Sequence, residues 1–348
     1  MKRKKAKKWA IMVCFSLLML ICFAPVSVLA LENFPFRNGD TITLTVPFSP
    51  GGGFDTYARL LAPPLEKAIE KIGDINVSVI VKNVAGAGGR VAHEQVFREK
   101  PDGRTLLLAH GGALPYHEVI YKANLKTGEF TYLGQISRFR NSIVARADLP
   151  IYSFQDLLKR SQKEPILMAS AGRGDDPHIS PLLISALLRE EGIEWKMDFV
   201  QFEGTAPARA SLPRKETEAM YTVIGSLLPI VDSGDARFIV VFAEERDPRC
   251  PKTPTIIEEK IPRAQEMLNA ISAAWTLVGP PKIPEATREI LRVAAFMAIN
   301  GKEFRERAAK AKRTVHYLPG DESCEIAAAK VEVIQRYKDM IEKAMGLR

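Results

Sequence analysis

The chain has 348 residues, of which 49 are basic and 41 acidic, giving a formal net charge of +8. The first thirty residues hold six of the basic side chains and no acidic ones, so the remaining 318 carry 43 basic against 41 acidic, a net of +2. This near-neutral remainder leaves no basic patch to attract nucleic acid or a membrane surface. At this length a single core stops growing, so we expect two lobes.

The N-terminal segment 1–30 predicts a cleaved secretory signal. A basic stretch, "MKRKKAKK", precedes 16 apolar residues, and "PVSVLA" supplies small residues before a cleavage site after Ala30. The alternative is a membrane anchor, but the apolar run is short for the roughly 20 residues of a membrane span. Cys22 does not predict a lipid anchor, because Ile21 stands where a small residue is required. We therefore expect a periplasmic protein in a two-membrane cell.

The first half of the remaining chain alternates strand and helix patterns. "TITLTVP" predicts a strand, and a helix follows from about Asp55, with apolar residues at spacings of four, three and four. Pro63 and Pro64 fall inside this helix and should kink it or split it in two. Further strands are expected at "VSVIVKN", "RTLLLAH", "FTYLGQIS" and "NSIVARA", and further helices after "AGAGG" and at "SFQDLLKRSQ".

The second half continues the alternation. "PILMASAG" predicts a strand before a helix that begins near Asp176, and more strands are expected at "KMDFVQF", "TEAMYTVI" and "ARFIVVFA". Residues 321–346 predict one C-terminal helix, with Asp321 or Ser323 as its N-cap. Strands alternating with helices indicate parallel sheets with helical crossovers, which is the α/β class with doubly wound lobes.

Two glycine-rich loops sit where such sheets bind ligands, between the end of a strand and the start of a helix. The first is "SPGGGFD" after the strand at 42–47, and the second is "SAGRGDDPH" after the strand at 166–169. Free backbone N–H groups and the positive end of the helix dipole make such loops suited to anions. The alternative is that the glycines serve only as turn residues. Two such loops, one in each half, favour an acidic small molecule held between two lobes.

Enzyme motifs are incomplete in this chain. "GAGGRV" has valine where a dinucleotide fingerprint needs its third small residue, and "HGG" is not matched by a Gly-x-Ser-x-Gly elbow. The five histidines form no helical pair with a glutamate, so we expect no metal, no cofactor and no catalytic residue. A secreted hydrolase using His110 or His178 as a base remains a less favoured alternative. Whether Cys250 and Cys324 form a disulfide stays open.

Longer stretches resemble the substrate-binding proteins of tripartite tricarboxylate transporters, the Bug-type receptors. "VPFSPGGGFDTYARLLA" is similar to the first-loop signature of that family, and "NVAGAGGRVAHEQVFREKPDGRTLLLAH" is similar to its next conserved segment. "MASAGRGDDPH" lies where the second ligand loop would be, and "FEGTAPA" and "DPRCPKTPTIIE" match later landmarks. The resemblance covers nearly the whole chain after the signal.

The resemblance implies a monomeric, non-enzymatic receptor with two α/β lobes that are joined by crossover strands and close on a ligand. It places residues 31–142 and 243–348 in the first lobe and 143–242 in the second. It also implies delivery of a small carboxylate or amino-carboxylate ligand to a membrane permease, with presentation to a sensor kinase as an alternative. The ligand would contact two loops, made of Phe48, Ser49, Pro50, Gly51, Gly52, Gly53 and Asp55, and of Ser170, Ala171, Gly172, Arg173, Gly174, Asp175 and Asp176.

The second loop departs from the family pattern, which usually carries Asn and hydroxyl residues there. This chain has Arg173, Asp175 and Asp176 instead. Asp176 is also a reasonable helix N-cap. At an effective dielectric near 20, two like charges about 4 Å apart repel by roughly 4 kcal/mol, so Asp175 would disfavour a plain dicarboxylate unless Arg173 pairs with one of the charges. We therefore expect a ligand of mixed charge, with an amine or a bound cation facing Asp175.

Overall fold

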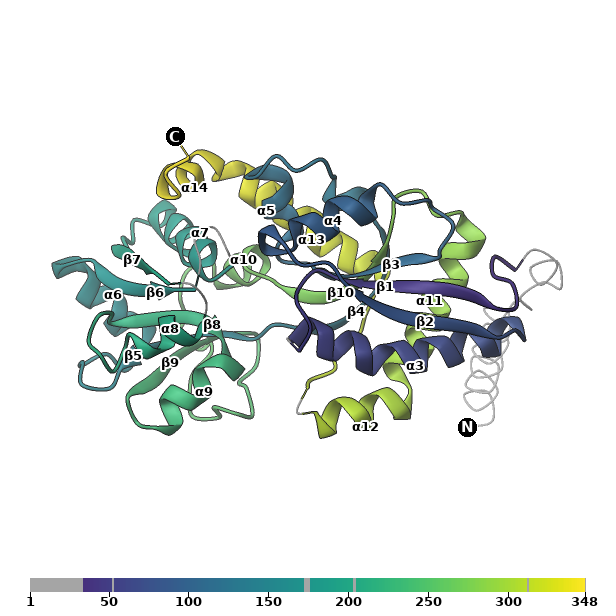
Figure 1. Ribbon diagram of the computed structural model, residues 1–348. Coiled ribbons are helices and arrows are strands. Elements are labelled where there is room, and N and C mark those ends of the chain that lie inside the picture. The colour runs from purple at the N-terminus through teal and green to yellow at the C-terminus, as the bar shows by residue number, and fades with distance from the viewer. Residues whose placement is uncertain (1–33, 52, 172–175, 203–204, 312, 348) are drawn as a thin grey trace, which may run out of the picture.

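The computed structural model describes residues 34–51, 53–171, 176–202, 205–311 and 313–347 (Figure 1). Two β-sheets, each with helices packed on its faces, form two lobes that lie side by side (Figure 1). The strands of the first sheet come from both ends of the described chain, whereas those of the second come from its middle. This is the α/β architecture that the sequence predicts.

The first sheet has six strands in the order β11-β4-β10-β3-β1-β2. Its strands are β1 (Asp40–Val46), β2 (Val77–Asn83), β3 (Thr105–His110), β4 (Thr131–Arg138), β10 (Ala274–Gly279) and β11 (Leu318–Pro319). Helices α3 (Gly53–Gly73) and α11 (Glu285–Asn300) contribute to the core on one face, and α4 (Arg90–Phe97), α5 (Leu114–Val119) and α13 (Gly320–Arg336) to that on the other. Also described in this part of the chain are η1 (Ala87–Gly89), η2 (Thr127–Glu129) and α12 (Lys302–Lys310).

Alternating side chains of β3 divide between the two cores of this lobe. Leu106 and Leu108 pack into the core under α3 and α11, whereas Leu107 and Ala109 pack into the core under α4 and α13. This is the period of two that a strand buried on both faces requires. The sheet is thus fixed from both sides, and the carboxyl ends of β1 and β3 are held in register beside the glycine loop.

The second sheet has five strands in the order β7-β6-β8-β5-β9. Its strands are β5 (Asn141–Arg146), β6 (Ile166–Ser170), β7 (Met197–Gln201), β8 (Ala219–Val223) and β9 (Ala236–Phe242). Its helices are α6 (Phe154–Lys163), α7 (Asp176–Glu190), α8 (Thr205–Ala210), α9 (Ile224–Asp232) and α10 (Ala264–Ala270). Ala219 and Tyr221 of β8 face one core and Met220 faces the other, so this sheet is also buried on both sides.

The chain crosses between the two sheets by short connections. Only Phe139 and Arg140 separate β4 of the first sheet from β5 of the second. The chain returns after β9 through segment 243–273, which includes α10, and enters β10. We retain the division into 31–142 with 243–348 and 143–242 as a proposal for the lobe boundaries. Side chains of segment 256–271, which includes α10, nevertheless pack in the core of the second lobe.

The C-terminal helices connect the lobes a third time. From α13 the chain continues into α14 (Lys338–Ala344), which lies beside α7 of the second lobe (Figure 1). One buried apolar cluster combines side chains of α5, α7 and these two helices: Tyr116, Val119, Ile120, Ile179, Leu183, Ile334, Ile341 and Met345. The two lobes are therefore packed together on the α5 side.

Several sequence expectations need correction. The sheets are mixed rather than parallel, because β5 and β10, the strands that arrive from the other lobe, pair antiparallel with their neighbours. The short β11 is also antiparallel to β4. Helix α3 is one element through Pro63 and Pro64, so the alternative of two helices is wrong. Its buried apolar face supplies tertiary packing that outweighs the local cost of the prolines.

The C-terminal run is also different from the expectation. It forms two helices that meet at Tyr337, and α13 begins after Pro319 with no side-chain cap. Asp321 pairs with Arg292 instead, and the Ser323 hydroxyl donates to the carbonyl of Pro319. Both predicted N-caps are therefore wrong, because tertiary partners occupy those side chains. The two cysteines of the described residues, Cys250 and Cys324, are free thiols.

Candidate functional site

The first glycine loop leads from β1 into α3, as the sequence predicts, and is braced from within. Ser49, Pro50 and Gly51 are exposed, and Gly51 has a φ of +86°, which glycine adopts without strain. The carbonyl of Phe48 accepts a hydrogen bond of 2.9 Å from the side chain of Asn83. Gly52 lies outside the described residues.

Asp55 braces this loop from within. Its carboxylate oxygen Oδ2 accepts a hydrogen bond of 2.9 Å from the backbone N–H of Gly51 and another of 3.0 Å from Nε of Arg59. The Arg59 guanidinium lowers the pKa of the Asp55 carboxyl below its usual value, and the Gly51 N–H adds to that effect. With its side chain buried, Asp55 is a structural brace of the loop.

An aromatic cluster lies behind the glycine loop. Phe54 stacks on the His110 ring at 5.4 Å and tilts against Trp275 at 5.8 Å between ring centroids. Phe139, in the connection between the lobes, lies 4.2 Å from Trp275 and 5.0 Å from His110. Phe48 completes the cluster at 4.6 Å from Phe54. The cluster joins the loop to Phe139 in the connection between β4 and β5, so the loop packs against the interlobe crossover.

His110 is a neutral member of this cluster. Burial lowers its pKa to about 3, so the ring is uncharged near neutral pH. His178 is also buried, with its ring 4.6 Å from that of Phe199. A general base needs a pKa near the working pH and access to the substrate. The low pKa and the burial of His110 therefore give the hydrolase alternative no support from that residue, and His178 is buried as well.

Arg313 lies beside the first loop, which the sequence did not indicate. A methyl group placed on Gly53 would lie 3.9 Å from Nη1 of Arg313 and 3.9 Å from Cζ2 of Trp275. The guanidinium is 5.9 Å from the centroid of the Tyr57 ring, and its buried Nε has no hydrogen-bond partner. Within the described residues, Arg313 forms no ion pair. The glycine loop therefore has a neighbouring arginine that lies over the Tyr57 ring but has no carboxylate partner among the described residues.

The second loop follows β6, and its described residues are Ser170, Ala171 and Asp176. Ser170 is fully buried and its carbonyl accepts a hydrogen bond of 2.9 Å from Phe202, while Ala171 is half-buried at a bend. The predicted ligand contacts Gly172, Arg173, Gly174 and Asp175 lie outside the described residues. The expectation that Asp175 faces a ligand therefore stays a prediction.

Asp176 is in the first turn of α7, as predicted, but its carboxylate points into the protein. Its Oδ1 atom accepts a hydrogen bond of 3.1 Å from the hydroxyl of Ser180 and lies 3.7 Å from Nζ of Lys330. Asn141 donates to Oδ2 at 3.4 Å and Tyr116 to Oδ1 at 3.5 Å. The side chain of Asp176 thus joins α7 to α5, to α13 and to the start of β5.

Lys330 is the charge partner of Asp176 and is 1% exposed. Its ammonium donates a 2.9 Å hydrogen bond to the carbonyl of Ser272 and lies 4.6 Å from the Tyr116 ring centroid. Burial lowers the pKa of Lys330 to about 8, although Asp176 acts in the opposite direction. A buried ion pair between α7 and α13 therefore links the lobes at their packed side.

The sequence did contain a signal for Lys330. The buried face of α13 runs through Ala327, Lys330 and Ile334, at spacings of three and four, so a lysine occupies an apolar position. A lysine in such a position needs a buried partner. No comparable local pattern marks Arg313, because its neighbours in the loop come from distant parts of the chain.

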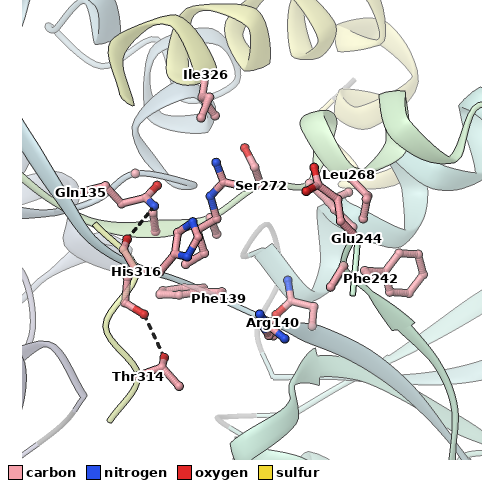
Figure 2. A pocket seen from close by; sticks show the side chains of 18 of the residues that line it. Gln135, Phe139, Arg140, Phe242, Glu244, Leu268, Ser272, Thr314, His316 and Ile326 are labelled. Atoms are coloured by element: carbon pink, nitrogen blue, oxygen red, sulfur yellow. Dashed lines mark hydrogen bonds between the residues drawn. The ribbon is translucent and has the colours of Figure 1, made fainter. Parts of the chain in front are cut away.

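A pocket of about 580 Å³ opens between the lobes (Figure 2). It is lined by residues of β4 and its junction with β5, of segment 242–249, of α10 and the start of β10, of segment 314–316, and of α13. None of the described residues of the two glycine loops lines it. The pocket and the predicted ligand loops are thus separate features of the interlobe region, and both are adjacent to the crossovers.

The described residues contain neither a metal-binding cluster nor a membrane-spanning helix. No group of three or more His, Cys, Asp or Glu side chains is placed to hold a metal ion in the described ranges. Among the same residues, no helix has the length and apolar character needed to cross a membrane.

Comparisons with known proteins identify the family of this chain. The sequence profile of the "Tripartite tricarboxylate transporter family receptor" matches residues 65–347. A UPF0065 protein from the tcbD-tcbE intergenic region of Pseudomonas sp. (strain P51) is 29% identical over 234 residues, which span 66% of this chain and 65% of that protein. The chain therefore matches slightly less than two thirds of the length of this relative.

Solved structures show the same fold. A ligand-free TctC solute binding protein from Polaromonas has a TM-score of 0.72 at 23% identity, with 89% of this chain and 99% of that one covered. MatC from Rhodopseudomonas palustris, solved with bound malate, has a TM-score of 0.61 at 26% identity, with 90% of this chain and 100% of that one covered. Because the Polaromonas protein is only 23% identical to this chain, its likeness shows a shared fold and nothing more.

Proposed function

Because the chain belongs to the tripartite tricarboxylate transporter receptor family, we propose that it captures a small carboxylate-bearing molecule between its two lobes. The captured molecule is then delivered to a membrane permease. The family is one of receptors rather than enzymes, so the lobes bind and release the ligand without changing it.

The observation that carries this proposal is the free charge of Arg313 beside the glycine loop. The first N–H groups of α3 have no partner within the helix, and the positive end of the helix dipole lies at the same place. A carboxylate bound there would accept charge-assisted hydrogen bonds from the loop and from the guanidinium. We assign ligand contacts to main-chain groups of residues 48–54 and 170–175, and assign Asp55 and Asp176 to holding the two loops.

The positive charge of Arg313 indicates the class of ligand. One arginine and one helix terminus suit one carboxylate, and the facing loop decides what the other end of the ligand carries. MatC was solved with malate, so small dicarboxylates are the first molecules to test. We keep the alternative of an amino-carboxylate, because Arg173 and Asp175 differ from the pattern of the family at the second loop.

The function is tested by binding without turnover. Titration calorimetry of the purified protein with malate, succinate, citrate and aspartate should show saturable binding of at least one of them at a single cleft. The ligand recovered after prolonged incubation should have an unchanged mass and proton spectrum. Conversion of the ligand would contradict the proposal, as would the absence of saturable binding across a wider panel of small carboxylic acids.

Export is a separate part of the proposal and has its own test. Processing after Ala30 should yield a periplasmic protein that begins at Leu31, because the signal pattern ends in small residues. Intact-mass analysis of the protein from a periplasmic extract would measure this directly. Retention of residues 1–30, or a lipid-sized mass increase at Cys22, would refute the proposed processing.

A further inference from the structure

The interlobe pocket of Figure 2 has the walls of a small-molecule site. Apolar side chains come from both lobes: Phe139 from the crossover, Phe242 from the end of β9, Leu268 from α10 and Ile326 from α13 (Figure 2). A volume of about 580 Å³ lies within the range of pockets that hold small molecules. The apolar walls suit a ligand with an apolar body.

Most of the cations in this pocket are already paired. Arg249 donates to the Asp247 carboxylate at 2.8 Å, and Nη1 of Arg140 lies 3.8 Å from the same carboxylate. Lys330 is held by Asp176 and by the Ser272 carbonyl. These three side chains therefore have little charge left for a ligand.

Arg138 is different. It is half-buried at the end of β4 and lines the pocket, yet within the described part of the chain its guanidinium forms neither an ion pair nor a hydrogen bond. Glu244 and Glu245 also line the pocket but are exposed, and Glu244 accepts a hydrogen bond of 3.3 Å from Gln265. A partly desolvated guanidinium without a partner gains most from an anion that enters the pocket.

We infer that this pocket is a second binding site, distinct from the glycine loops, for an organic monocarboxylate. The carboxylate would pair with Arg138, and the apolar body would lie against Phe139, Phe242 and Leu268. A ligand with one carboxylate is favoured over a ligand with two. Arg138 can pair with the first carboxylate, whereas a second would be repelled by Glu244 and Glu245, which line the same pocket.

Calorimetry with phenylacetate and hexanoate tests this site. Arg138→Gln removes the free charge and should weaken phenylacetate binding by about tenfold or more, the usual loss for a charge-assisted hydrogen bond. Arg138→Lys should recover part of the affinity. Arg140→Gln is the matched control, because Arg140 already shares its charge with Asp247, and it should change the affinity by less than about threefold. Thermal unfolding of each variant checks that the fold is kept.

The location of the probe separates this inference from the proposed function. Gly53→Val, in the glycine loop, should leave phenylacetate affinity unchanged, and the anomalous signal of bromophenylacetate in a soaked crystal should lie between Arg138 and Leu268. Equal affinity in wild type and Arg138→Gln would overturn the inference, as would loss of binding in Gly53→Val or a bromine located at the glycine loop. No binding of either monocarboxylate would overturn it as well, while leaving dicarboxylate capture in the cleft untouched.

Discussion

Gly53→Val should weaken binding of the cleft ligand by about two orders of magnitude while leaving the fold intact. Gly53 has no positive φ, and a methyl group on it would make ordinary contacts of 3.9 Å with Arg313 and Trp275. The branched side chain would nevertheless fill the space in which a carboxylate reaches the loop N–H groups and the guanidinium. Loss of two charge-assisted hydrogen bonds at roughly 1.5–3 kcal/mol each accounts for the size of the effect. Titration calorimetry with the best-binding dicarboxylate measures it.

Gly51→Ala is the matched control for this experiment. A methyl group on Gly51 would meet no atom within 4 Å, but the residue has a φ of +86°. The substitution should therefore cost about 1 kcal/mol of stability through backbone strain and leave the affinity nearly unchanged. The opposite pattern, with normal affinity in Gly53→Val, would mean that the loop is only a turn. Arg313→Gln should weaken binding in the same assay if its charge meets the ligand.

Lys330→Met should destabilise the folded protein by about 3–5 kcal/mol, the usual cost of removing one partner of a buried ion pair. The substitution keeps an unbranched apolar side chain but leaves the Asp176 carboxylate buried without its cation. It also removes the hydrogen bond to the Ser272 carbonyl. Equilibrium unfolding in urea measures the change.

The double variant Lys330→Met with Asp176→Asn identifies the cause. Neutralising Asp176 removes the uncompensated charge, so the double variant should be more stable than Lys330→Met alone. If the stability that the double variant loses relative to wild type equals the sum of the two single losses, the two groups act independently and the ion pair does not link the lobes.

The buried pair of Lys330 and Asp176 also predicts how the stability of the folded protein changes with pH. The pKa of Lys330 is about 8 in the folded chain, against an ordinary value of 10.5 for an exposed lysine. Between these values the unfolded chain holds a proton that the folded chain has released, so this residue makes stability rise with pH. Urea unfolding at pH 8 and pH 10 should show wild type gaining stability relative to Lys330→Met. Parallel pH profiles for the two proteins would contradict the shifted pKa.

Periodicity and turn chemistry were enough to predict most of the fold. Strand β1, the start of α7 at Asp176 and the strands of the second sheet lie where the apolar patterns place them. The mixed sheets could not be predicted, because strand direction depends on the path by which β5 and β10 cross between the lobes. The single helix through Pro63 and Pro64 depends on packing in the same way, since burial of its apolar face outweighs a local cost.

The candidate site likewise has one part that the sequence predicts and another that only the tertiary structure shows. The sequence by itself determined that a glycine loop stands between a strand and a helix, because φ > 0 turns and close backbone approach need residues without a Cβ. The tertiary structure alone decided which charges are free: Asp55 and Asp176 are occupied by Arg59 and Lys330, whereas Arg313 has no such partner among the described residues. A free charge depends on neighbours from distant parts of the chain, and local sequence patterns carry no record of those neighbours.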